Sequence, residues 1–151
     1  MELTPTTIET YLRHPFHQML AVAERLGDAL VNERPVGPTT NAVSALIIHC
    51  CGVTEFWLGH VALGRPSTRD RDREFSRAAS VAELRALVES TIATALADVA
   101  KLEAGEGTDE GGRQFLIDGD TSDGSVVVHV LEELYQHLGH MDLTADVLLA
   151  R

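Results

Sequence analysis

The sequence predicts an all-α protein, a four-helix bundle with long crossover connections, in a single domain over residues 1–151. Four separate stretches carry apolar residues at every third or fourth position, which is the spacing of one face of an α-helix. Helix-capping residues precede these stretches, and segments rich in glycine, proline or charge separate them. The chain is long enough to bury its own core and has no internal repeat, so one bundle accounts for it.

The first helix is predicted to begin after Thr4, with Pro5 at its first position, and to end before Pro35. Pro15 lies inside this stretch and predicts a kink or a fresh start, because proline has no N–H to donate within a helix. The apolar positions at helical spacing are Leu12, Phe16, Met19, Ala23, Leu26 and Leu30. His14 and His17 flank Pro15 and are interpreted as surface residues.

The second helix, predicted from Ala42 to about Leu63 with Thr40 or Asn41 as its cap, is apolar on all sides over its first three turns. Such a helix is a central one that packs on several faces. His49 lies in its middle, and a buried imidazole must bond a partner. That partner is either a backbone carbonyl or buried glutamate, or a metal ion.

A charged segment, residues 65–74, follows this helix. Alternating charges are typical of a solvated connection, and the alternative is an arginine-bearing loop that clamps a carboxylate or phosphate of a substrate. Ser80 and Glu83 form a capping box that opens the third helix, which is predicted to end near Glu103. Residues 104–124 then form the long crossover before the last helix, and a loop of this length is more often a lid or pocket wall than a plain linker.

The fourth helix contains the stretch on which the functional interpretation depends. At about 100° per residue, His129, Glu133, His137 and His140 lie within roughly 80° of one another on one face. Glu133 and His137, four positions apart, can chelate one divalent ion without bending the helix. The alternative is a solvated polar face, and a third ligand from another element is needed to decide between them.

Composition excludes several function classes. A formal net charge of −11 and a pI near 4.9 disfavour binding to nucleic acid or to anionic membranes. Polar residues interrupt the longest apolar run, residues 42–63, which is therefore expected to be a buried helix and not a membrane span. No signal peptide is evident, and the adjacent Cys50 and Cys51 are a poor framework for a disulfide. The chain is expected in the cytoplasm.

His49 in an apolar second helix, followed by Glu133-x-x-x-His137-x-Gly139-His140-x-Asp142 in the fourth, resembles the DinB/YfiT-like superfamily of four-helix bundles. The branch it resembles most includes mycothiol-dependent maleylpyruvate isomerase and related thiol-dependent transferases, which have glutamate at the position of Glu133. The resemblance implies a divalent ion, zinc or nickel, held by His49, Glu133 and His137.

A site with two histidines and one glutamate leaves coordination positions open, as catalytic metal sites do. The resemblance therefore implies an enzyme that activates a low-molecular-weight, mycothiol-like thiol for S-transfer or thiol-assisted isomerisation of a small-molecule substrate. The alternatives are a hydrolase that activates water and a non-catalytic bundle that binds a small molecule. Arg69, Arg71 and His140 are expected to orient the substrate, and Trp57 to wall the thiol pocket. A homodimer is one expected assembly.

Overall fold

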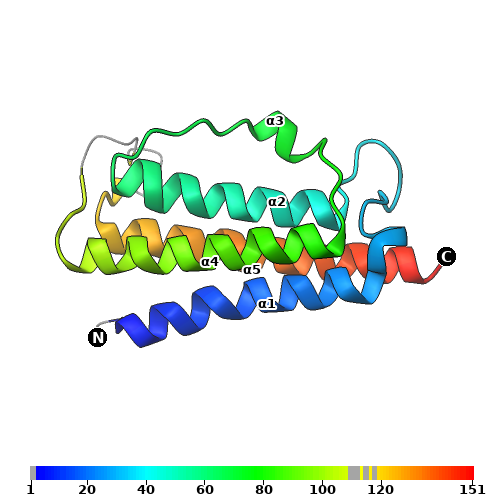
Figure 1. The fold of residues 1–151 in the computed structure, drawn as a ribbon, viewed down its shortest axis with the longest axis horizontal. Helices are drawn as coiled ribbons and strands as arrows, with labels where there is room; N and C mark the ends of the chain where they lie inside the picture. Colours follow the sequence, from blue (N-terminus) through cyan, green and yellow to red (C-terminus); the bar gives the residue numbers. More distant parts are fainter. Residues whose placement is uncertain (1–2, 109–112, 114–115, 117–118) are drawn as a thin grey trace.

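The computed structural model describes residues 3–108, 113, 116 and 119–151. Its four long helical segments are α1 (Pro5–Leu30), α2 (Val43–Thr54) continued by the π-helix η1 (Glu55–Ala62), α4 (Val81–Glu103) and α5 (Asp123–Leu149). A single turn, α3 (Arg71–Glu74), lies between α2 and α4 (Figure 1). Within the described ranges there is no strand, and the predicted all-α four-helix fold is confirmed.

The direction of the helices corrects the predicted position of the crossover. Helices α1 and α5 run in one direction, and α2 and α4 run in the other (Figure 1). The connection that travels the length of the bundle is therefore residues 63–80, which includes α3, and it joins two parallel helices. Residues 104–122 instead join α4 to α5 at the same end of the bundle. The length of a connection does not determine the direction of the helices on either side of it.

Helix α1 begins as predicted but bends at a different residue. The Thr4 hydroxyl accepts a hydrogen bond from the Thr7 amide at 3.1 Å, which is a helix N-cap. The helix continues through Pro15, which is buried, so the predicted fresh start there is wrong. Packing in the core stabilises the proline ring in place and offsets one missing hydrogen bond. The break occurs at Gly27, whose φ of 62° is readily adopted by glycine.

The start of α2 is held by the backbone and not by the predicted caps. Ala42 occupies the N-cap position without a side-chain hydrogen bond, and the Ser44 amide donates to the carbonyl of Val31 at 2.9 Å. The Val31 carbonyl thus accepts from a first-turn amide that would otherwise need a side-chain acceptor such as Thr40 or Asn41. The capping-box prediction for α4 is confirmed at Ser80.

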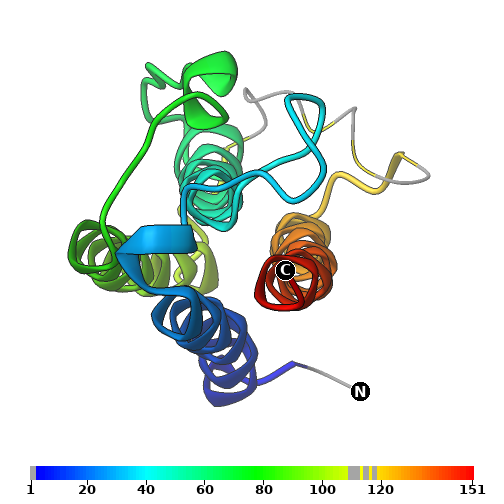
Figure 2. The same ribbon diagram turned by 90° about the vertical axis from the view of Figure 1, so that its right-hand side faces the viewer.

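The continuous segment Val43–Ala62 is packed on several sides, as its composition predicts. Helices α4 and α5 flank α2 on two different sides (Figure 2). Among the described residues this is the one stretch apolar and long enough to cross a membrane, with a mean hydropathy of 1.3, but 72% of it is buried inside the protein. Burial of this extent is a property of the core helix of a soluble protein.

The described part of the connection from α4 to α5 is fastened to the end of η1. The Thr108 amide donates to the Ala62 carbonyl at 2.8 Å, and the buried Arg113 donates to the same carbonyl at 3.1 Å. Arg113 also pairs with Asp123 at the start of α5, at 2.7 Å. The prediction that residues 104–124 form a lid or pocket wall falls partly on residues outside those described, and it stays a prediction.

Candidate metal centre

Three side chains from two helices converge between α2 and α5. His49 comes from α2 and Glu133 and His137 come from α5, and one ligand atom of each lies within 4.8 Å of the others. The His49 and His137 rings meet edge to face with their centroids 4.9 Å apart. His137 Nε2 lies 3.4 Å from Glu133 Oε2. The predicted convergence of these three residues is confirmed.

The donor set fits a divalent metal ion. Two imidazole nitrogens and a carboxylate oxygen are a ligand combination used by catalytic zinc sites. Bonds of about 2.0–2.2 Å would bring two ligand atoms to about 4.4 Å or less. Small shifts of Glu133 and His137, which are only half-buried, are enough to reach that separation. Burial lowers the pKa of His137, and the neighbouring His49 lowers it further, so the ring keeps the lone pair that a metal requires.

His49 is oriented by a residue that the sequence did not single out. Its Nδ1 lies 2.8 Å from Oε2 of Glu74, in α3, and both side chains are buried. When Nδ1 donates its proton to this carboxylate, Nε2 carries the lone pair and is free for a metal ion. The sequence offered a buried glutamate and a metal ion as alternative partners for His49, and the imidazole has one nitrogen for each.

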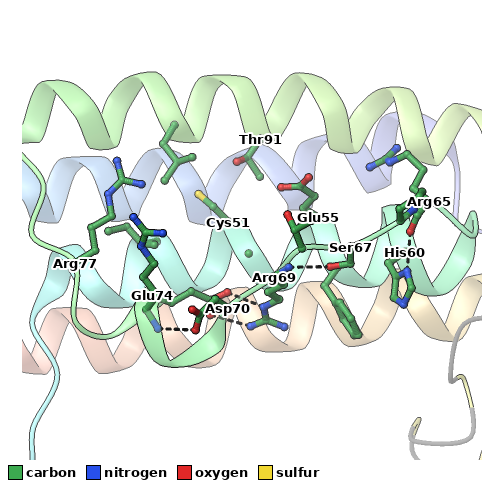
Figure 3. A pocket seen from close by; sticks show the side chains of 17 residues that line it. Cys51, Glu55, His60, Arg65, Ser67, Arg69, Asp70, Glu74, Arg77 and Thr91 are labelled. Atoms are coloured by element: carbon green, nitrogen blue, oxygen red, sulfur yellow. Dashed lines mark hydrogen bonds and ion pairs between the residues drawn. The ribbon is translucent and has the colours of Figure 1, made fainter.

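Glu74 is in turn fixed by Arg69. The Arg69 guanidinium donates from Nε to Oε1 at 2.6 Å and from Nη2 to Oε2 at 3.0 Å (Figure 3). This two-point contact is the strong geometry of an arginine–carboxylate pair. The connection from α2 to α4 therefore holds the His49 ring through its Nδ1 atom. Helical periodicity could not predict this contact, because the 25 residues from His49 to Glu74 include a loop.

Gly52, one turn after His49, leaves the space that the Glu74 carboxylate fills. A Cβ at this position would lie 2.3 Å from Glu74 Oε1. We expect Gly52→Ala to lower the free energy of unfolding by about 1 kcal/mol, because displacing the carboxylate costs more than the roughly 1 kcal/mol that alanine adds to a helix. Gly139→Ala is the matched control, because nothing lies within 4 Å of its Cβ, and it should raise stability. Urea unfolding measures both; equal stabilisation would contradict the predicted clash.

The three residues predicted to orient the substrate lie at different places relative to the three converging side chains. Arg69 contacts Glu74 and lies over the Phe56 ring at 5.4 Å. His140 is exposed, with its ring 6.3 Å from that of His137. Arg71 is exposed on α3 and is not brought to the three converging side chains, because the side of this single turn that carries Glu74 faces inward. The roles of these residues toward a substrate remain predictions.

Trp57 lies next to a histidine of the same polar stripe. Its ring packs edge to face against His129, with centroids 4.5 Å apart. The His129 Nδ1 atom is buried and has no hydrogen-bond partner among the described residues. Trp57 and His129 therefore lie together where η1 meets α5, and the expected contact of Trp57 with a thiol remains a prediction.

The comparisons with known proteins agree with this arrangement at the level of the family. The model of the DinB superfamily matches residues 10–141, which includes all three converging ligands. No curated protein matches the chain. No solved structure matches it. Because the match covers most of the sequence and the helical fold agrees with it, the chain belongs to the DinB superfamily.

Proposed function

We propose that this protein is a divalent-metal-dependent enzyme that activates a low-molecular-weight, mycothiol-like thiol for S-transfer or thiol-assisted isomerisation. The observation that supports the proposal is the convergence of His49, Glu133 and His137 at an interface of two helices. Glutamate at position 133 is the feature by which the chain resembles the thiol-dependent branch of its superfamily.

The residues of the chain have distinct tasks in this proposal. His49, Glu133 and His137 would hold zinc or nickel, and three protein ligands leave at least one coordination position for a substrate. A bound ion supplies a Lewis acid that favours the ionised form of a thiol or of water. By accepting from Nδ1, Glu74 would leave Nε2 of His49 free to hold the ion. His140, which is exposed one turn beyond His137, would contact the second substrate.

The cellular setting is proposed on the same basis. A strongly acidic chain with a buried central helix is expected to act on small molecules in the cytoplasm and not on nucleic acid or membranes. The thiol and the electrophile are both small, and a homodimer remains one expected assembly.

The proposal predicts metal-dependent thiol transfer. Protein incubated with mycothiol and monochlorobimane should form the fluorescent thiol adduct faster with zinc or nickel than after metal removal. His137→Ala, which lacks one ligand, should lose the metal-dependent part of the rate, and His17→Ala, an exposed histidine on α1, should keep it. Adduct formation is followed by fluorescence against a protein-free control.

Two results would contradict this proposal. Metal-dependent hydrolysis of esters or amides without transfer to any electrophile would indicate that the site activates water. Metal binding without either reaction, over a panel of thiols and electrophiles, would indicate a non-catalytic binding protein.

A further inference from the structure

A second cavity lies apart from the candidate metal centre, between α2 with η1, the connection 63–80 and α4 (Figure 3). Its volume is about 460 Å³, which is within the range of small-molecule sites. Among the described residues, none from α5 lines it, so Glu133 and His137 take no part in it. The Arg69–Glu74 pair forms part of its wall. Both residues also contact Nδ1 of His49, Glu74 through Oε2 at 2.8 Å and Arg69 through Nη2 at 3.3 Å.

The cavity has an apolar lining on two sides. Ile48 and Cys51 project from one face of α2, and Leu87 lies on α4. Phe56 of η1 adds an aromatic ring. These groups can cover the apolar body of a ligand, although most of the other residues that line the cavity are polar or charged.

The same cavity is lined by four arginines, and only two of them form ion pairs with carboxylates that the structure describes. Arg65 is matched by Asp98, and Arg69 is matched by Glu74. Arg73 and Arg77 form no ion pair with any carboxylate that the structure describes. The Arg77 amide donates to the Arg73 carbonyl at 3.2 Å, so the two residues are one turn apart and both side chains reach the cavity.

The carboxylates that line the cavity form no ion pair with these two arginines, although Glu83 of α4, outside the lining, interacts with the charge of Arg77. Asp70 caps α3 by accepting from the Arg73 amide at 3.0 Å, and Glu74 is held by Arg69 and His49. Glu55 lies on η1, nearer the middle of the cavity, whereas Arg77 lies at one end of it (Figure 3). One end of the cavity therefore presents two guanidinium groups beside an apolar wall.

We propose that this cavity binds a small organic carboxylate, with its apolar body between α2 and α4 and its carboxylate between Arg73 and Arg77. Guanidinium groups match the planar geometry of a carboxylate with paired hydrogen bonds. The site is separate from the proposed reaction at the metal, so it exists whether or not the protein transfers a thiol.

Benzoate is the probe for this site, and benzamide is its uncharged control. The protein, residues 1–151, is first freed of metal by a chelator that is then removed by dialysis. Backbone amide signals are followed by NMR during titration with benzoate. We expect saturable shifts at Thr91 and Leu87 with a Kd near or below about 1 mM, and at least tenfold weaker binding of benzamide.

Variants of the two arginines test the assignment. The double variant Arg73→Gln/Arg77→Gln should weaken benzoate binding at least tenfold, because charge-assisted hydrogen bonds are lost. Arg71→Gln is the control for a general effect of charge, because it removes one positive charge from α3, close to Arg73, but does not line the cavity. All three residues are exposed, so the fold should survive, which the unliganded NMR spectrum verifies.

Three outcomes would overturn the proposal. The first is the absence of saturable shifts up to about 20 mM benzoate, far above the expected Kd. The second is equal weakening by Arg71→Gln, which would indicate a general effect of net charge. The third is shifts confined to the region of Glu133 and His137, which would place the carboxylate at the metal ligands. Retention of benzoate binding by His137→Ala would support the cavity, and this holds even if the thiol-transfer assay fails.

Discussion

Removing the metal ion should lower the melting temperature of the protein by roughly 5–10 °C, and His137→Ala should abolish this difference. An ion that binds only the folded state at about a hundredfold over its Kd adds about 2.7 kcal/mol to stability. For a domain of about this size, about 1 kcal/mol moves the melting temperature by roughly 2–4 °C. His137 supplies one of three ligand atoms that lie within 4.8 Å of one another. Its loss leaves two ligands, which bind an ion far more weakly.

The measurement is a set of melting curves with chelator and with added zinc or nickel. His17→Ala is the control, because this histidine is exposed on α1 and outside the converging group. It should keep the full metal-dependent increment. An equal metal response of the wild type and His137→Ala would mean that the polar stripe of α5 is a solvated face.

Replacing Glu74 by glutamine should weaken zinc or nickel binding by about 10–100-fold. The glutamine keeps the shape of the side chain, but it removes the negative charge that accepts from His49 Nδ1 and pairs with Arg69. The imidazole then has a weaker anchor and a less basic Nε2. Competition with a chromophoric chelator measures the affinity on the folded protein, and melting of the metal-free protein separates any loss of stability.

Glu55→Gln is the matched control for this affinity. It removes the same charge from an exposed carboxylate on η1 that does not bond to His49. Its metal affinity should equal that of the wild type. If Glu74→Gln and Glu55→Gln bind metal equally well, the Glu74–His49 hydrogen bond does not support the metal ligand.

The sequence by itself determined the helices and the shared face of Glu133 and His137. Both follow from the 3.6-residue period of one helix, which needs no knowledge of the neighbours. It also determined that α2 is buried on several sides, because a helix apolar on all sides is stable only when it is surrounded. From the same burial it followed that His49 must have a partner. Resemblance to a family, and not periodicity, supplied the third ligand.

Only the tertiary structure decided what lies around that histidine. Glu74 reaches His49 because the connection from α2 to α4 crosses the bundle and places α3 against Gly52. The cap of α2 from the Val31 carbonyl and the arginine-lined cavity have the same origin. Each of these contacts joins residues of two different elements, and the period of a single helix cannot predict which residues of two elements meet. They depend on how the helices and connections pack, and local backbone preferences do not determine that packing.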